Sequence, residues 1–181
     1  MGAVLTQNTA WTNADSALAS LLRAGVGLPA DLLAIPRRRL AALIRSSGYF
    51  NQKARKLAVI SMLFSRPRAL TPRGAPSREA LLAEWGIGRE TADSILLYAF
   101  QKPVFVVDAY TRRILSRIGL IHGSESYDAV QALFHDALEP DPAVFNEYHA
   151  LIVEHAKVHC MTRPLCAGCP VRPCRHRRLQ S

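Results

Sequence analysis

The chain of 181 residues contains no long hydrophobic run, and it has fewer acidic than basic side chains. No stretch approaches the ~20 consecutive apolar residues that a membrane-spanning helix requires. The start of the chain also lacks the basic region followed by a long apolar segment that marks a secretion signal. These absences predict a cytoplasmic protein without a membrane partner. Hydrophobic residues make up 49% of the chain, which excludes global disorder.

The shortage of acidic residues leaves a strong positive charge. Lys and Arg together number 23 against 14 Asp and Glu, which gives a formal net charge of +9. A charge of this size favours a polyanionic partner, most often a nucleic acid. Most of the basic residues are arginines, whose planar guanidinium groups suit phosphate. The alternative is a protein whose basic charge has no specific partner.

The four cysteines all lie near the C-terminus, with the spacing C-x5-C-x2-C-x4-C over Cys160, Cys166, Cys169 and Cys174. In a chain without a secretion signal, such a cluster indicates a metal site rather than disulfides. Four thiolates suit either a [4Fe–4S] cluster or zinc. Zinc sites usually contain two C-x2-C pairs, whereas this chain has one. His155 and His159 lie one helical turn apart just upstream, so a Cys/His zinc site is a further alternative.

Apolar residues recur at helical spacing through most of the chain, and Gly and Pro separate the periodic stretches. The predicted helices cover residues 15–23, 36–48, 51–64, 78–84, 89–100, 108–117, 126–138 and 143–159. Only residues 104–107 resemble a strand, and one short strand cannot form a sheet. The predicted fold class is therefore all-α.

A tight turn, Gly86-Ile87-Gly88, separates two of the predicted helices. Glycines permit a positive φ and a close approach to the backbone. The exposed N–H groups of such a turn, beside a helix N-terminus, form an anion site, and Arg89 adds positive charge. A DNA phosphate would fit there without any base being read. The alternative is an ordinary helical hairpin.

A single carboxylate, Asp108, follows the apolar run at residues 104–107 and precedes Tyr110 and Arg112. Aspartate is among the residues that most often occupy a helix N-cap. Its position alone therefore favours a capping role.

Several segments together resemble the helix-hairpin-helix DNA glycosylases of the endonuclease III superfamily, also called HhH-GPD. The segments are GIGRETA from Gly86, VVD ending at Asp108, GAVLTQNTAW at the start, GYFNQKARKL from Gly48, and the cysteine-containing tail from His149. Within the superfamily the chain is most similar to the branch of type III 3-methyladenine glycosylases. The resemblance implies a two-lobed helical fold. Residues of about 14–125 would form a helical barrel lobe with the hairpin at 78–100, residues 1–13 and 126–159 a second lobe, and residues 160–174 an iron–sulfur loop.

The resemblance also assigns roles to individual residues. Asp108 becomes the catalytic acid group, and the four cysteines become ligands of a [4Fe–4S] cluster, although both outer gaps are one residue shorter than is usual in the family. Gln7 and Tyr49 would fill the space that a flipped base leaves, with Phe50 as the alternative to Tyr49. Glu90 and Tyr110 are the candidates for the base pocket. The residues expected to bind DNA are Gln7, Asn8, Tyr49, Asn51, Lys53, Gly86, Gly88, Arg89 and Arg112.

The implied function is removal of a damaged base, such as an alkylated base, from double-stranded DNA, by a monomer in the cytoplasm near the nucleoid. The enzyme would flip the nucleotide out of the helix, and a carboxylate would stabilise the positive charge that develops on the sugar. Members of the superfamily that also cut the strand carry a lysine where this chain has Glu90, so we expect no lyase activity. The alternatives are an endonuclease III-type glycosylase acting on oxidised pyrimidines, and a non-catalytic DNA-binding module.

One departure concerns the start of the chain. Met1 to Gln7 resembles the middle of a helix, and family members carry a segment before it. We therefore expect an N-terminal segment to be missing, together with the aromatic residues that this segment supplies to the base pocket in the type III branch.

Overall fold

The computed structural model describes residues 1–66, 70, 74–172 and 174–178, and every regular element in that part of the chain is a helix. The one β interaction found there is an isolated antiparallel bridge between Leu70 and Pro76. The predicted all-α class is therefore confirmed. None of the described helices is both long enough and apolar enough to cross a membrane.

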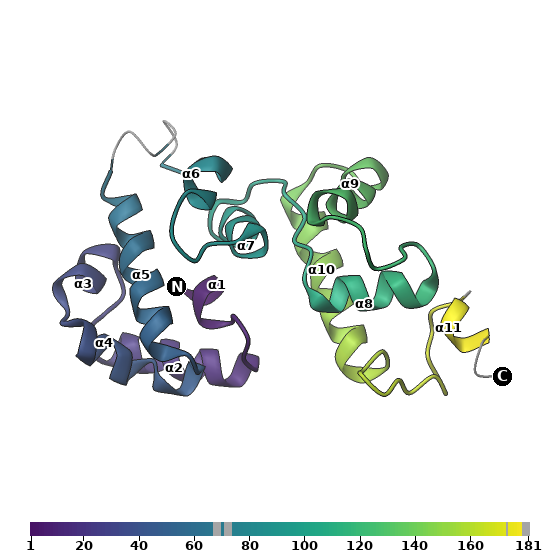
Figure 1. Cartoon of the computed structure of the whole chain (residues 1–181), viewed down its shortest axis with the longest axis horizontal. Coiled ribbons are helices and arrows are strands. Elements are labelled where there is room, and N and C mark those ends of the chain that lie inside the picture. Colours follow the sequence, from purple (N-terminus) through teal and green to yellow (C-terminus); the bar gives the residue numbers. More distant parts are fainter. Residues whose placement is uncertain (67–69, 71–73, 173, 179–181) are drawn as a thin grey trace. The chain divides into compact units, whose positions relative to one another are not determined.

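Figure 1 shows the helices in chain order. They are α1 (Gly2–Leu5), α2 (Trp11–Arg23), α3 (Pro29–Ala34), α4 (Arg37–Leu43), the 3-10 turn η1 (Arg45–Ser47), α5 (Phe50–Phe64), α6 (Arg78–Leu82), α7 (Arg89–Phe100), α8 (Ala109–Ile118), α9 (Tyr127–Ala137), α10 (Pro142–Val158) and α11 (Arg175–Arg178).

Side-chain caps fix the beginnings of several helices where the sequence predicts them. Ser77, Asp108 and Ser126 each accept a hydrogen bond from the backbone N–H three residues later, at α6, α8 and α9. These bonds satisfy donors that the first helical turn leaves without partners. The predicted bounds of α7 are confirmed.

Other bounds differ from the prediction. Helix α2 begins at Trp11 instead of Asp15, and Pro36 is the N-cap of α4 rather than its first helical residue. Helix α3 was not predicted, because six residues contain too few apolar repeats to show a period. Its start carries recognisable signals nonetheless, since Pro29 opens it and Asp31 Oδ2 accepts the N–H groups of Gly27 and Leu28 at 3.0 and 2.8 Å.

The chain divides into two compact units, Met1–Ile95 and Leu96–Ser181, with the boundary inside α7. In the first unit α5 packs against α3, α4 and α1. In the second unit α10 packs against α8. The predicted distribution of segments between two lobes stays a prediction.

The apolar run before Asp108 forms no strand and lies instead at the centre of the second unit. Phe105, Val106 and Val107 are almost fully buried. The Phe105 ring stacks on Phe134 with centroids 3.7 Å apart and meets the edge of Phe145 at 5.6 Å.

Side chains of α9 replace the partner strand that this extended segment lacks. Phe105 N–H donates to His135 Nε2 at 3.1 Å, Val107 N–H donates to the Tyr127 hydroxyl at 3.2 Å, and Gln131 Nε2 donates to the Phe105 carbonyl at 2.6 Å. Buried backbone groups need such partners. The segment is therefore fixed by α9, and it delivers Asp108 to a defined place at the start of α8.

Candidate functional site

Asp108 is the N-cap of α8, as its position predicts. Its Oδ1 atom accepts hydrogen bonds from the Thr111 backbone N–H at 2.7 Å and from the Thr111 hydroxyl at 2.8 Å. Thr111 is fully buried, which holds this pair of donors in place. The Asp108 side chain is 14% exposed, and its second oxygen, Oδ2, lies 3.6 Å from His149 Nε2. One oxygen therefore performs the capping and the other remains for a second role.

The surroundings of Asp108 keep it ionised. Burial raises the pKa of this carboxyl, but the contact with His149 and the two hydrogen bonds from Thr111 outweigh burial, so that the pKa of Asp108 lies below its ordinary value. The side chain is therefore a carboxylate at neutral pH. A largely buried carboxylate can stabilise positive charge more strongly than an exposed one, because little water screens it.

The Gly86–Gly88 turn joins α6 to α7 in the first unit. Gly86 has φ +77°, a conformation that favours glycine, and a Cβ atom there would lie 2.7 Å from Lys56 Cε, so that the Lys56 side chain would have to shift. Gly88 is exposed, with no neighbouring atom within 4 Å of a Cβ. Arg78 ties the two helices together by donating to both oxygens of the buried Asp93 at 2.7 and 3.0 Å. The turn is thus held firmly, while its phosphate-binding role stays a prediction.

Gln7 connects the hairpin to the start of the chain. Its Nε2 donates to the Thr91 hydroxyl at 2.7 Å, and its Oε1 accepts from Lys56 Nζ at 2.5 Å. The side chain is half-buried. Both ends of the amide are therefore bonded within the first unit, and contact with DNA would require Gln7 to exchange these partners. No sequence motif distinguishes Lys56, which packs on Gly86.

Tyr49, Asn8 and Asn51 are exposed, as a DNA-contacting role requires. The Tyr49 side chain is 66% exposed, and its backbone has φ +44°. A left-handed conformation is costly for a bulky residue and is found mostly at functional sites. Asn8 also has a positive φ, +50°. Phe50, the alternative to Tyr49, is half-buried at the first position of α5.

Lys53, which the sequence selects as a DNA-binding residue, is instead a buried structural lysine. It is 2% exposed, and its Nζ donates to the carbonyls of Leu5 and Ser47 at 2.8 and 2.6 Å. Burial and the nearby charge of Lys56 lower the pKa of Lys53. The ammonium group joins α1, η1 and α5 from inside, which does not favour a phosphate contact, and the DNA-binding role of Lys53 stays a prediction.

We expect Lys53→Met to destabilise the protein by about 2–4 kcal/mol, because two buried carbonyls lose a charged donor. Urea unfolding measures this change. Lys157→Met, at an exposed position of α10, is the control and should change stability by less than about 0.5 kcal/mol. Unchanged stability of Lys53→Met combined with weaker DNA binding would support the original assignment.

The remaining predicted DNA and base-pocket residues lie near the surface. Arg89 and Glu90 are exposed in the first turn of α7. Arg112 is half-buried and donates to the Glu125 carbonyl at 2.9 Å, so it helps to hold the connection between α8 and α9. Tyr110 is half-buried against the core of the second unit, and the Arg113 guanidinium lies 5.0 Å from its ring centroid. Their contacts with DNA stay predictions.

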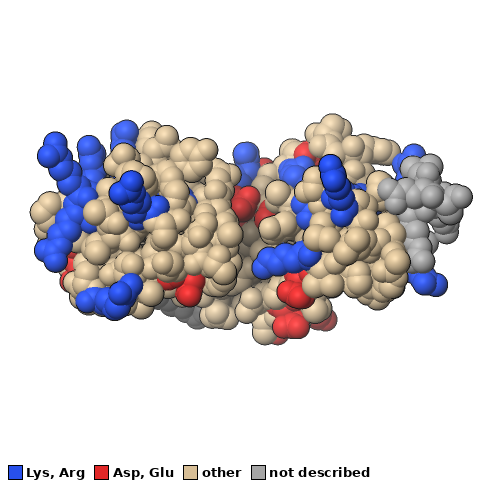
Figure 2. Space-filling model, turned by 90° about the horizontal axis from the view of Figure 1, so that it is seen from below, with Lys and Arg blue, Asp and Glu red and all other residues tan. Residues whose placement is uncertain are grey.

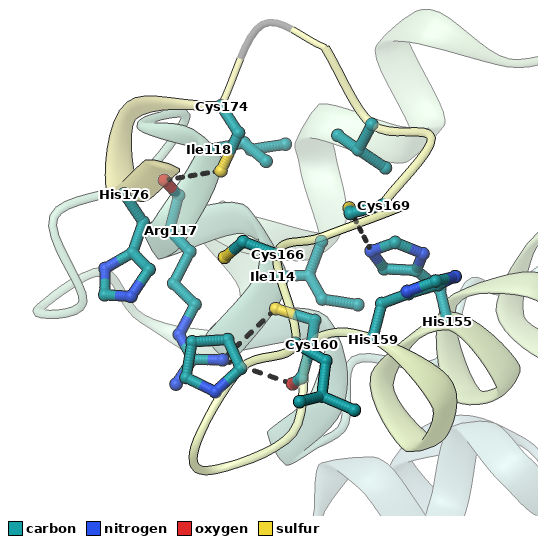
Figure 3. Close-up of a pocket in the computed structure, with 13 residues that line it drawn as sticks. Ile114, Arg117, Ile118, His155, His159, Cys160, Cys166, Cys169, Cys174 and His176 are labelled. Atoms are coloured by element: carbon teal, nitrogen blue, oxygen red, sulfur yellow. Dashed lines mark hydrogen bonds between the residues drawn. The ribbon is translucent and has the colours of Figure 1, made fainter. Parts of the chain in front are cut away.

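The four cysteines line a single pocket between α8, the end of α10 and the tail, as Figure 3 shows. None of them forms a disulfide in the described part of the chain. The rest of the lining is largely apolar, with Ile114, Ile118 and Val171. No three His, Cys, Asp or Glu side chains within the described residues are spaced as ligands of one metal ion. Four thiols around one apolar pocket nevertheless fit the donor set of an iron–sulfur cluster.

Arg117 holds the first part of the cysteine loop and was not selected from the sequence. Its Nη1 donates to the Cys160 carbonyl at 3.2 Å, as Figure 3 shows. Nη1 also donates to the Met161 carbonyl at 2.5 Å, and Nη2 donates to the Thr162 carbonyl at 2.9 Å. Nη1 also lies 3.3 Å from Cys160 Sγ. A cation at this distance would complement the negative charge of a metal-bound thiolate.

His155 approaches Cys169, with 3.7 Å between Nε2 and Sγ. Burial and the neighbouring His159 lower the pKa of His155. Neutral histidine is the form that binds metals, so the Cys/His zinc alternative agrees with this contact as well.

Lys and Arg side chains are prominent on the face shown in Figure 2. In the first unit, exposed arginines include Arg37, Arg38 and Arg39 of α4 and Arg55 of α5. The Arg55 guanidinium stacks on the exposed Trp85 ring at 3.8 Å from its centroid. The surface therefore carries the positive charge that the composition predicts.

Residues 1–140 match the HhH-GPD superfamily of base excision DNA repair proteins, and the chain belongs to this superfamily. It is 39% identical over 179 residues to the Methanocaldococcus jannaschii protein MJ1434, whose name provisionally assigns it to the DNA repair glycosylases. That alignment covers 95% of this chain and 81% of the relative. Endonuclease III of Bacillus subtilis is 31% identical over 146 residues, covering 79% of this chain and 64% of the enzyme.

Solved structures of glycosylases resemble this chain as well. The Helicobacter pylori 3-methyladenine DNA glycosylase MagIII, bound to 1,N6-ethenoadenine, superposes with a TM-score of 0.74 at 32% identity, over 86% of this chain and 82% of that one. A trapped endonuclease III–DNA covalent intermediate superposes with a TM-score of 0.84 at 25% identity, over 99% of this chain and 83% of that one. The predictions of the superfamily and of its helical glycosylase fold are confirmed.

Proposed function

We propose that this protein is a DNA glycosylase that removes a damaged base by hydrolysis, with Asp108 as the catalytic carboxylate. The observation that carries the proposal is the state of Asp108 in a chain of this superfamily: ionised, 14% exposed and fixed through one oxygen by Thr111. Breaking an N-glycosidic bond leaves positive charge on the sugar, as other sugar hydrolyses do. The second oxygen of Asp108 stabilises that charge or orients the attacking water.

The first unit supplies the grip on DNA. The Gly86–Gly88 turn and Arg89 hold a backbone phosphate at the N-terminus of α7. Tyr49 is the wedge that enters the space left by the flipped nucleotide, because its ring is exposed and its backbone is held in a strained conformation. Gln7 acts from the neighbouring loop after releasing Lys56 or Thr91.

The substrate we propose is an alkylated base, in agreement with the 32% identity to the MagIII structure. Endonuclease III relatives at about the same identity favour a second candidate, an oxidised pyrimidine. Duplexes carrying 3-methyladenine, 1,N6-ethenoadenine or thymine glycol distinguish the two by the free base that is released. Binding to these duplexes without release of any base would instead support the non-catalytic DNA-binding module.

We expect hydrolysis without strand cleavage, because Glu90 cannot form the imine that a lysine nucleophile forms in lyases. Sodium borohydride traps such imines. The expected result is an intact abasic strand and no covalent protein–DNA complex. Efficient trapping by the wild-type protein would show that another amine, such as Lys102, has become the nucleophile.

Cys160, Cys166, Cys169 and Cys174 would hold a [4Fe–4S] cluster, with zinc as the alternative. The pocket that they line lies beside α8, whose N-terminus carries Asp108. A cluster held by these cysteines would tie the tail to α8 and α10, which line the same pocket.

A further inference from the structure

His149 of α10 faces the catalytic carboxylate, and the mechanism above assigns it no task. Its side chain is 12% exposed, and its Nε2 lies 3.6 Å from Asp108 Oδ2. Nε2 is inaccessible to solvent and has no hydrogen-bond partner in the part of the chain that the structure describes. Buried polar atoms are rarely left without a hydrogen-bond partner, so we expect Nε2 to have a specific role.

The other ring nitrogen of His149 is firmly bonded. Tyr98 Oη lies 2.6 Å from His149 Nδ1. Burial and the negative charge of Asp108 raise the pKa of Tyr98 to about 12, so the phenol keeps its proton at neutral pH. The hydroxyl can then donate to Nδ1. In a neutral imidazole this leaves the ring proton on Nε2, the atom that faces Asp108.

The surroundings of His149 leave these two partners as its polar contacts. Tyr98 approaches from α7 and Asp108 from the start of α8, and both are titratable. The Phe105 ring meets the imidazole edge-on at 6.2 Å between centroids. An apolar ring on one side and two polar partners at the two nitrogens fix the orientation of the imidazole.

We propose that Tyr98 and His149 form a positioning pair for the catalytic Asp108, in which Tyr98 selects the Nε2–H tautomer of His149 and that N–H aims at Asp108 Oδ2. This proposal rests on the proposed function. Thr111 holds Oδ1 and His149 holds Oδ2, so that the carboxylate plane cannot rotate. The separation of 3.6 Å exceeds the 2.7–3.2 Å of an N–H···O bond. Catalytic hydrogen bonds are often long without substrate and shorten in its complex.

Neither residue touches the reacting atoms in this scheme. Tyr98 and His149 act through Asp108, by fixing its direction and by keeping it ionised. Their loss should therefore slow excision and raise the pKa of Asp108, while DNA binding stays unchanged.

The direct test is the tautomer of His149 in the DNA-free protein. Two-bond ¹H–¹⁵N correlation spectra of ¹⁵N-histidine-labelled protein distinguish Nε2–H from Nδ1–H, and loss of the signals in His149→Gln assigns them. We expect Nε2–H in the wild type and a mixture of tautomers in Tyr98→Phe. Tyr148→Phe is the matched control, because Tyr148 is 43% exposed, as Tyr98 is, and lies beside Phe105, as His149 does. It should leave the tautomer unchanged. A wild-type Nδ1–H tautomer would overturn the proposal.

A second measurement follows the Asp108 carboxyl carbon by ¹³C NMR through an acid titration. The midpoint should rise in His149→Ala, because burial continues to raise the pKa of Asp108 while the opposing contact is lost. His149→Gln keeps an N–H donor and should restore most of the difference. An unchanged midpoint in His149→Ala would contradict the positioning pair.

Single-turnover excision then measures the functional effect. We expect the rate to fall about 10- to 100-fold in His149→Ala and about 3- to 10-fold in Tyr98→Phe, with the DNA dissociation constant within about twofold of the wild type. Rates equal to the wild type would overturn the proposal. If the wild type itself releases no base, the proposed function fails, whereas the two NMR measurements still decide whether the pair holds Asp108.

Discussion

Replacing Asp108 by asparagine should reduce base excision by about 10³-fold, because the transition state loses the carboxylate that stabilises its positive charge. Asparagine preserves the cap, since its carbonyl oxygen can still accept the two hydrogen bonds from Thr111. The phosphate contacts stay as they are, and one negative charge near the DNA disappears. DNA affinity should therefore stay the same or increase. Single-turnover excision and a binding titration measure the two quantities separately.

The chain offers a matched control for this substitution. Asp141 is the N-cap of α10 and accepts a hydrogen bond from the Ala143 N–H at 2.7 Å, but it is exposed. Asp141→Asn should leave excision unchanged. Excision by Asp108→Asn at the wild-type rate would move the catalytic role to another residue. If Asp108→Asn fails to fold while Asp141→Asn folds normally, the charge of Asp108 acts mainly by stabilising α8.

Replacing Cys166 by serine should remove the metal and destabilise the second unit. The wild type, purified anaerobically, should be brown and contain about four irons per chain, since four thiolates suit a soft cluster. Metal binding at such a site contributes directly to folding. We therefore expect Cys166→Ser to contain almost no iron and to melt lower by roughly 10 °C or more.

His155→Ala separates the two metal alternatives. If the four cysteines hold the cluster, this variant keeps its iron, because His155 only borders Cys169. A colourless wild-type preparation that contains one zinc and no iron would contradict the cluster, and loss of that zinc in His155→Ala would identify a Cys/His site.

Local signals in the sequence were enough to predict the helical framework around the site. Asp108 and Ser77 lie directly before periodic apolar stretches, and each caps the helix that follows. The capping role also predicts a donor three residues later, which is where Thr111 lies. The two readings of Asp108, as cap and as catalytic carboxylate, prove compatible because each uses a different oxygen.

Contacts between distant segments could not be predicted in this way. The residues whose carbonyls accept from the Lys53 ammonium group lie 48 and 6 positions away, and backbone carbonyls produce no sequence pattern. Tyr98 and His149 are separated by 51 positions. The run at residues 104–107 has the composition of a strand, but His135, Gln131 and Tyr127 of α9 supply its hydrogen bonds. Tertiary packing determined each of these outcomes.

The time course of base release from a duplex containing one 3-methyladenine tests the central claim most directly. Wild-type protein in excess over DNA should release the free base in a single exponential phase, leaving an abasic strand that breaks only after alkali treatment. Asp108→Asn should bind the same duplex and release about 10³-fold more slowly. Tight binding with no base released from this duplex, or from those carrying 1,N6-ethenoadenine or thymine glycol, would contradict the account.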